Sequence, residues 1–181
     1  TDRLDYFLRD AFMRGVMPQF VVDEILNQIQ FEGDILYFED ARFAGMVAVM
    51  FMNCTRMLWS DPNSIGSWSL LADAIKAAYE QGIVTEEDFF TDDETLMQKL
   101  RASTDKRIQQ NLARLQPGKF FRYAPKESAE FYRKNKARYI DPLVKTEAGF
   151  QRVSVLVPNF AIEVEQFKQD YAYLGVVPIQ N

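Results

Sequence analysis

Residues 39–59 constrain the fold more than any other part of the sequence. They read as a long helix that is apolar almost all the way round, including the stretch from Phe43 to Met52. Such a helix has to be covered on every side by other elements. The stretch is only about half of the roughly 20 residues that cross a bilayer. We therefore expect a central core helix, and no membrane partner.

Shorter elements surround this helix in the sequence. A predominantly α-helical body is predicted for residues 1–117, with helices at 2–14, 20–28, 67–81 and within 92–115, and a hairpin at 29–38. Gln116-Pro-Gly118 ends the helical pattern. A small α+β subdomain is predicted for residues 118–181, with strands at 120–123, 137–140 and 153–157 and helices at 125–135 and 159–171.

The composition excludes several kinds of catalysis within this chain. It has no His and a single Cys, Cys54. Histidine general bases, Ser-His-Asp triads, His-ligated metals and Cys-based zinc sites are therefore ruled out within it. One cysteine is typical of a reducing compartment, so we expect a cytoplasmic protein. Because residue 1 is Thr and a helix follows almost at once, we expect a part of a longer polypeptide.

Charge is divided unevenly along the chain. Residues 1–98 carry 6 basic and 18 acidic side chains, net −12, whereas residues 99–152 carry 14 basic and 5 acidic, net +9. This split indicates electrostatic recognition, either of an outside partner or between the two parts of the chain.

The first helix has a chemically suggestive polar face. Asp2, Tyr6 and Asp10 follow one another at i+4 steps, with Arg3 beside them, and they share one side of a helix. An Asp there can ligate a hard cation, Arg and Tyr can hold phosphate and sugar oxygens, and the second Asp can accept from a hydroxyl.

A plainer interpretation of the same helix also holds. Asp5–Arg9 and Asp10–Arg14 are i, i+4 ion pairs, worth roughly 0.2–0.5 kcal/mol each on a surface helix. In either interpretation, Leu4, Leu8, Ala11 and Phe12 form the stripe that we expect to be buried.

The run from Asp2 to Asp10 resembles the last motif of the HD-domain phosphohydrolases, which is close to D-[RK]-x-D-Y-x-x-R-D. Three further stretches are similar to that family: residues 33–43, Thr91-Asp-Asp-Glu94, and residues 136–144 followed by Arg152-Val-Ser154. The last of these resembles the tail of the dNTP triphosphohydrolase-like branch.

The resemblance implies a mostly helical HD-type body that often assembles into homo-oligomers. It implies that Asp2 is a ligand of a divalent metal ion in the parent protein, and that Arg3, Tyr6 and Asp10 are catalytic residues contacting phosphates and sugar. The branch releases nucleoside and triphosphate by hydrolysing the 5′ ester. The family's His and His-Asp ligands lie upstream of this motif, so the parent's upstream part is an expected partner. This chain alone is predicted to be inactive.

A second candidate site lies in the basic segment. Its cations alternate with aromatic residues, a combination that suits nucleotides or single strands through charge attraction and ring stacking. The other interpretation is a solvated face whose aromatic residues form the subdomain core. The candidate anion- or nucleotide-binding residues are Lys119, Arg122, Arg133, Lys134, Lys136 and Arg138.

A third, weaker candidate is the loop that starts at Trp59 and runs to Asn63, with Trp68 beyond it. It could line a pocket, but its turn chemistry favours a capped break between two core helices.

The sequence thus favours one function and leaves one alternative. The first is a portion of a metal-dependent HD-superfamily phosphohydrolase acting on (deoxy)nucleotide phosphate esters. The alternative is a His-less regulatory module that binds nucleotide or nucleic acid without catalysis.

Overall fold

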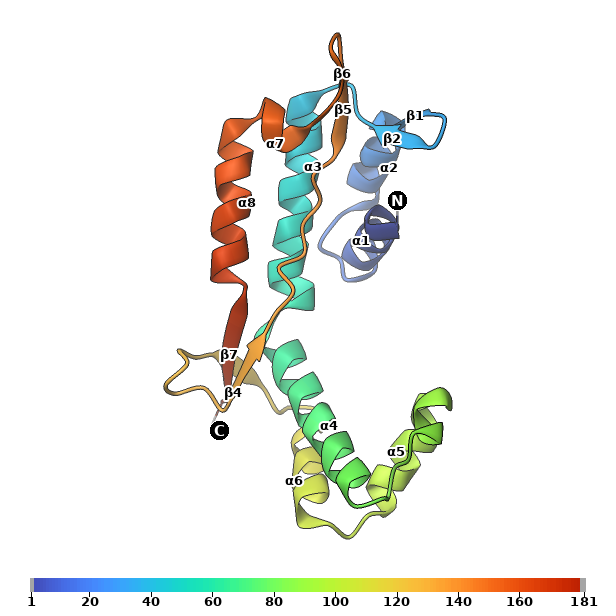
Figure 1. Ribbon diagram of the computed structural model, residues 1–181, viewed down its shortest axis with the longest axis vertical. Helices are drawn as coiled ribbons and strands as arrows, with labels where there is room; N and C mark the ends of the chain where they lie inside the picture. Colours follow the sequence, from blue (N-terminus) through green and yellow to red (C-terminus); the bar gives the residue numbers. More distant parts are fainter. Residues whose placement is uncertain (1, 180–181) are drawn as a thin grey trace. The chain divides into compact units, whose positions relative to one another are not determined.

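The computed structural model describes residues 2–179, whose course is shown in Figure 1. Contacts divide these residues into two compact units. The first unit contains the chain up to residue 60 together with residues 134–173, and the second contains residues 61–133 together with the chain from residue 174 on. The predicted boundary at 117/118 lies inside the second unit.

The first unit is built around α3 (Ala41–Cys54), which continues as one π-helical turn, η1 (Thr55–Trp59). Val47, Phe51 and Met52 on α3 are fully buried, so the predicted central helix is confirmed. Asp40 starts α3 by accepting hydrogen bonds from the backbone N–H groups of Arg42 and Phe43. These bonds favour the carboxylate and lower the pKa of Asp40.

Four further helices cover α3 in this unit: α1 (Asp2–Met13), α2 (Gln19–Gln28), α7 (Val153–Leu156) and α8 (Pro158–Asp170). Figure 1 shows α8 running alongside α3. Phe7 from α1, Ile25 from α2 and Phe167 from α8 are fully buried in the same apolar cluster as α3. The core of the unit therefore joins the beginning of the chain to residues 153–170.

Two antiparallel hairpins complete the first unit. One is β1 (Gln30–Glu32) with β2 (Ile35–Tyr37), and the other is β5 (Leu143–Thr146) with β6 (Gly149–Arg152). The backbone N–H of Phe38 donates to the carbonyl of Leu143 at 2.9 Å, which ties the first hairpin to the second. The first hairpin was predicted, whereas the second was not.

The second unit packs α4 (Pro62–Glu80) against α6 (Lys106–Arg114), with η2 (Glu87–Phe90) and α5 (Asp93–Ala102) between them in sequence. Its strands β3 (Phe121–Tyr123), β7 (Tyr173–Pro178) and β4 (Phe131–Lys134) lie in that order in one sheet. Gly66 on α4 allows the Phe121 ring to approach, because any Cβ there would overlap the ring.

Three predicted elements are wrong, each because a long-range partner decides the local structure. Residues 125–135 are a loop and a strand rather than a helix, since Glu130 N–H donates to the carbonyl of Val176 on β7. Residues 153–157 begin with the short helix α7 rather than forming a strand, since Asp141 accepts from the backbone N–H and hydroxyl of Ser154. Residues 137–140 form no strand.

The architecture is therefore mixed, mostly helical with small antiparallel sheets. Between residues 2 and 179, no helix is long and apolar enough to cross a membrane.

Candidate functional site: a cationic cleft in the first unit

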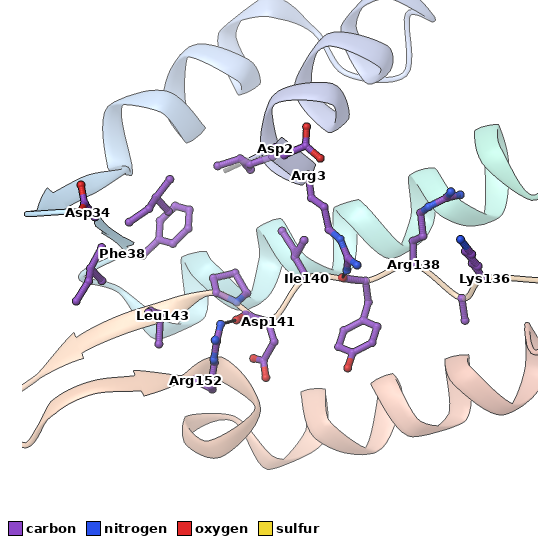
Figure 2. Close-up of a pocket in the computed structure, with 16 residues that line it drawn as sticks. Asp2, Arg3, Asp34, Phe38, Lys136, Arg138, Ile140, Asp141, Leu143 and Arg152 are labelled. Atoms are coloured by element: carbon purple, nitrogen blue, oxygen red, sulfur yellow. Dashed lines mark hydrogen bonds between the residues drawn. The ribbon is translucent and has the colours of Figure 1, made fainter. Parts of the chain in front are cut away.

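An open cleft of about 1120 Å³ lies in the first unit (Figure 2). Its walls come from the start of α1, the β1–β2 hairpin, residues 136–143 and Arg152. We call residues 136–143 the strap. Asp2 and Arg3 thus face residues more than 130 positions later in the chain. The charged lining residues are Arg3, Lys136, Arg138 and Arg152 with Asp2, Asp34 and Asp141.

The strap is extended but belongs to no sheet over residues 137–142, because much of its backbone bonding comes from outside partners. The Thr55 hydroxyl donates to the carbonyl of Arg138 at 2.8 Å. Arg3 Nη1 donates to the carbonyl of Tyr139 at 2.8 Å, and Arg152 Nη1 donates to that of Asp141 at 2.7 Å. These charge-assisted bonds hold the strap in place at the cleft wall.

The four cations share the cleft with three carboxylates, Asp2, Asp34 and Asp141, so its lining has a net formal charge of +1. Arg3 and Arg152 donate hydrogen bonds to carbonyl oxygens of the strap rather than to carboxylates. Within residues 2–179, none of the ion pairs closer than 4.0 Å includes Arg3, Lys136, Arg138 or Arg152. Each guanidinium carries five N–H donors, so donors remain for a ligand. The cleft can therefore attract and hold an anion.

The carboxylates of the cleft do not assemble into a metal centre. The Asp141 carboxylate accepts two hydrogen bonds from Ser154, one from the backbone N–H at 3.0 Å and one from the hydroxyl at 2.6 Å. Among the residues that the structure describes, no group of three or more His, Cys, Asp or Glu side chains could hold a metal ion. The predicted role of Asp2 as a metal ligand stays a prediction that requires ligands from elsewhere.

A smaller hollow of about 400 Å³ adjoins the cleft and shares Asp2, Arg3 and Arg138 with it. Tyr6 and Trp59 supply its aromatic wall. Their ring centroids are 5.2 Å apart at an interplanar angle of 73°, an edge-to-face contact. The predicted catalytic residues Arg3 and Tyr6 are thus brought to one place, at the start of α1.

Asp10 lines neither the cleft nor the hollow. Its Oδ2 accepts a 3.0 Å hydrogen bond from Trp59 Nε1, and its Oδ1 lies 3.9 Å from Arg9 Nε. Asp10 and Tyr6 both contact Trp59, so they share one side of α1 as the i+4 spacing predicts. What Asp10 does in the structure is orient the indole; its predicted contact with a sugar hydroxyl stays a prediction.

The apolar stripe predicted for α1 is confirmed only in part. Leu8 and Ala11 are buried as expected, but Phe12 is 43% exposed and Phe7 takes the fully buried position. The helix turns Phe7 toward Phe51 on α3, at 5.3 Å between ring centroids, and Phe12 therefore faces outward. The predicted Asp5–Arg9 ion pair is present at 3.5 Å, whereas the predicted Asp10–Arg14 pair is not among the ion pairs of residues 2–179, since Asp10 lies beside Arg9 instead.

The six predicted anion-binding residues divide between the two units. Lys136 and Arg138 line the cleft, and Lys134 precedes them in the first unit. Lys119, Arg122 and Arg133 belong to the second unit. Arg133 is used internally, since its Nη2 lies 3.1 Å from Asp73 Oδ1 and its guanidinium lies over the Phe131 ring. Lys136 and Arg138 are thus the two of these six residues that line the cleft.

Among the charged lining residues of the cleft, sequence reasoning gave no role to Asp34, Asp141 and Arg152. Trp59, which lines the hollow, begins the loop that was the third candidate. Asp141 and Arg152 fall within the stretches that resemble the phosphohydrolase tail, which was the available signal. The loop after Trp59 does hold the predicted cap, because Asp61 accepts from the N–H groups of Asn63 and Ser64. Trp68 lies in the second unit.

Cys54, the last residue of α3, is buried. Burial, with a smaller contribution from the negative charge of Asp10, raises the pKa of the Cys54 thiol to about 11. A buried thiol with so high a pKa is a poor nucleophile, because the thiolate is the reactive form. It takes no part in the site.

Comparison with known proteins adds a relative but no family. No family model matches the chain. Over 144 residues, which are 80% of this chain and 44% of the relative, it is 24% identical to "Uncharacterized protein YdhJ" of Bacillus subtilis (strain 168). The chain spans less than half the length of this relative. Most of the present sequence is therefore similar to one part of a longer bacterial protein.

Proposed function

We propose that this chain is a portion of a metal-dependent HD-superfamily phosphohydrolase acting on (deoxy)nucleotide phosphate esters. One observation carries the proposal. Arg3 comes from the stretch that resembles the family's last motif, and Lys136 and Arg138 come from the stretch that resembles its tail. These two stretches line the same cleft.

In this proposal the chain binds and orients the phosphate end of the substrate. Guanidinium groups offer planar pairs of N–H donors that match phosphate oxygens, and the Lys136 ammonium adds a point charge. Because Arg3 and Arg152 also fix the strap through carbonyl bonds, the cations that receive phosphate are held before it arrives. Such preorganisation reduces the ordering that binding has to bring about.

The metal ion is outside what the described residues can hold. A single suitable carboxylate, Asp2, cannot retain a divalent ion against water. The proposal therefore places the remaining ligands on upstream polypeptide. The parent protein is then the hydrolase, and the 181-residue chain alone is inactive. The homo-oligomer and the cytoplasmic location stay predictions.

The alternative function is a regulatory module that binds nucleotide without catalysis. The absence of His from the chain and of a metal-binding group from residues 2–179 favours it. Both functions use the same cationic cleft, so binding alone does not separate them.

The test compares the 181-residue chain with the polypeptide extended to the start of its reading frame. Binding of inorganic tripolyphosphate and dGTP is measured by calorimetry, and release of tripolyphosphate from dGTP is measured with Mn²⁺. We expect both proteins to bind and only the extended one to hydrolyse. Asp2→Asn should abolish hydrolysis, whereas Asp5→Asn, an exposed Asp on the same helix, should retain it.

Two results would overturn parts of the proposal. Hydrolysis that survives in Asp2→Asn would remove Asp2 from the metal site. Binding without hydrolysis by the extended polypeptide would favour the regulatory module.

A further inference from the structure

The cleft and the adjoining hollow differ in chemistry although they share three residues. The cleft is lined by four cations and three carboxylates, whereas the hollow adds the aromatic wall of Tyr6 and Trp59 to the three shared charged residues. Arg3 and Arg138 stand where the two meet. A ligand that fills both needs an anionic end and a flat ring joined by a short connection.

The position of Trp59 depends on an unusual backbone feature. It is the last residue of the π-helical turn Thr55–Trp59, which follows α3 and closes with a hydrogen bond from Ser60 N–H to the carbonyl of Thr55 at 2.8 Å. Single π-helical turns are frequent at functional sites, because the extra residue per turn changes the direction of the side chains that follow.

Three contacts then fix the indole ring. Its N–H donates to Asp10, its ring meets Tyr6 edge to face, and Phe51 lies 5.2 Å away between ring centroids. Asp10 takes the only polar atom of the indole, so what remains for a ligand is apolar ring surface. Trp59 is only half-buried and lines the hollow, so part of that surface is accessible.

We infer that the hollow is a nucleobase subsite, in which the base of a bound nucleotide stacks against Trp59 while its phosphates lie toward Arg3, Arg138 and Lys136. This inference rests on the proposed function and names the side chains that recognise the base. Stacking accepts every base, because each has a π-face. With its indole N–H already occupied, Trp59 provides affinity for a base without selecting among bases.

The experiment uses the fact that the chain has two tryptophans. In a Trp68→Phe background, Trp59 is the remaining tryptophan, and excitation at the red edge of indole absorption selects it over the tyrosines. We expect dGTP and dCTP to quench its emission, and inorganic tripolyphosphate to bind by calorimetry without comparable quenching. A nucleotide that binds and leaves Trp59 emission unchanged would overturn the inference.

Substitution gives a second, independent measurement. Trp59→Leu should weaken nucleotide binding by about tenfold or more, the scale of one base stacked on an aromatic ring. Tripolyphosphate binding should change less than twofold. The matched variant Trp59→Phe keeps an aromatic ring but loses the indole N–H and part of the ring surface, so it should retain more of the preference for nucleotide over tripolyphosphate than Trp59→Leu does.

The outcomes separate this inference from the proposed function. Equal affinities for nucleotide and tripolyphosphate, both unchanged in Trp59→Leu, would overturn the base subsite and leave the phosphate cleft standing. Failure of both ligands to bind would overturn the proposed function and the subsite with it. If Trp59→Leu does not fold, the quenching measurement in the Trp68→Phe protein decides.

Discussion

Arginines from one basic segment are used differently in the two units. In the second unit, Arg114 forms two hydrogen bonds with the carboxylate of Glu130, at 2.6 and 2.7 Å. Arg133 pairs with Asp73 and also donates to the Ser69 hydroxyl. These cations are neutralised by neighbours within the unit, and their bonds connect the helices to the sheet.

In the first unit, Arg152 and Arg3 bond to carbonyl oxygens, and Lys136 and Arg138 line the cleft beside them. A carbonyl oxygen satisfies a donor but does not cancel a charge, so these cations keep their charge for a ligand, although three carboxylates also line the cleft. The net +9 of residues 99–152 therefore says little about binding. Which acceptor each cation meets decides whether it is structural or available.

Charge reversal at the strap tests which unit binds anions. Lys136→Glu with Arg138→Glu should weaken tripolyphosphate binding more than about 100-fold at low salt, since two charge-assisted hydrogen bonds at roughly 1.5–3 kcal/mol each are lost. The matched pair Lys119→Glu with Arg122→Glu, in the second unit, should change it less than twofold. Calorimetry measures both. A reversed ranking would move the anion site to the second unit.

The next effect concerns alkaline stability of the first unit. The raised pKa of Cys54, about 11 against the ordinary 9.0, means that the folded protein holds its proton where the unfolded chain loses it. The contribution of the Cys54 thiol to the free energy of unfolding is therefore fully present below pH 9. It falls as pH rises toward 11, by about 1.4 kcal/mol per pH unit. Urea unfolding of wild type and Cys54→Ala between pH 9 and 11 should show a difference in the free energy of unfolding that shrinks at this rate. A difference that stays constant with pH would contradict the prediction.

A smaller effect separates structural from available arginines by stability. Arg133→Ala should lower the free energy of unfolding by about 1 kcal/mol, because it leaves Asp73 and Ser69 without their partner. Arg138→Ala, whose side chain has no ion pair with another residue between 2 and 179, should change it by less than about 0.5 kcal/mol. Urea midpoints of the two variants provide the measurement. Equal losses would remove the distinction between the units.

The smallest effect is an acid-side one in the second unit. A hydrogen bond from Lys99 and the backbone N–H of Thr85 lower the pKa of Asp88 below its ordinary 3.8. This carboxylate therefore adds stability above pH 3.8, which is lost as pH falls through the lowered value. Asp88→Asn should be less stable than wild type at pH 7, and the two should converge below pH 3.8. Persistence of the difference at lower pH would show that packing, rather than charge, is responsible.

Local patterns predict much of this fold and only part of the site. Apolar periodicity is enough to predict helices α1, α3 and α8, and turn residues are enough to predict the β1–β2 hairpin. The β4 strand could not be read locally, because its partner β7 follows some forty residues later. Residues 137–140 have the pattern of a strand but pair with none. Side chains of Arg3 and Thr55 bond carbonyls of the strap in place of a neighbouring strand, which local sequence does not reveal.

The candidate site shows the same limit. The i+4 spacing correctly placed Tyr6 and Asp10 on one side of α1. It could not show that Asp10 holds Trp59, since this depends on a π-helical turn at the end of another helix. Nor could charge counting show that Arg133 meets Asp73 while Arg138 faces the cleft.

The interrupted course of the first unit has a consequence for biosynthesis. Its cleft joins Arg3 to the strap, and residues 61–133 are made between them. At about 5–20 residues per second, α3 emerges seconds before α8, whose Phe167 helps to bury it. During that interval, Val47, Phe51 and Met52 lack part of their cover. We therefore expect nascent chains halted after residue 133 to be captured by chaperones that bind apolar segments, and those halted well after residue 173 to escape.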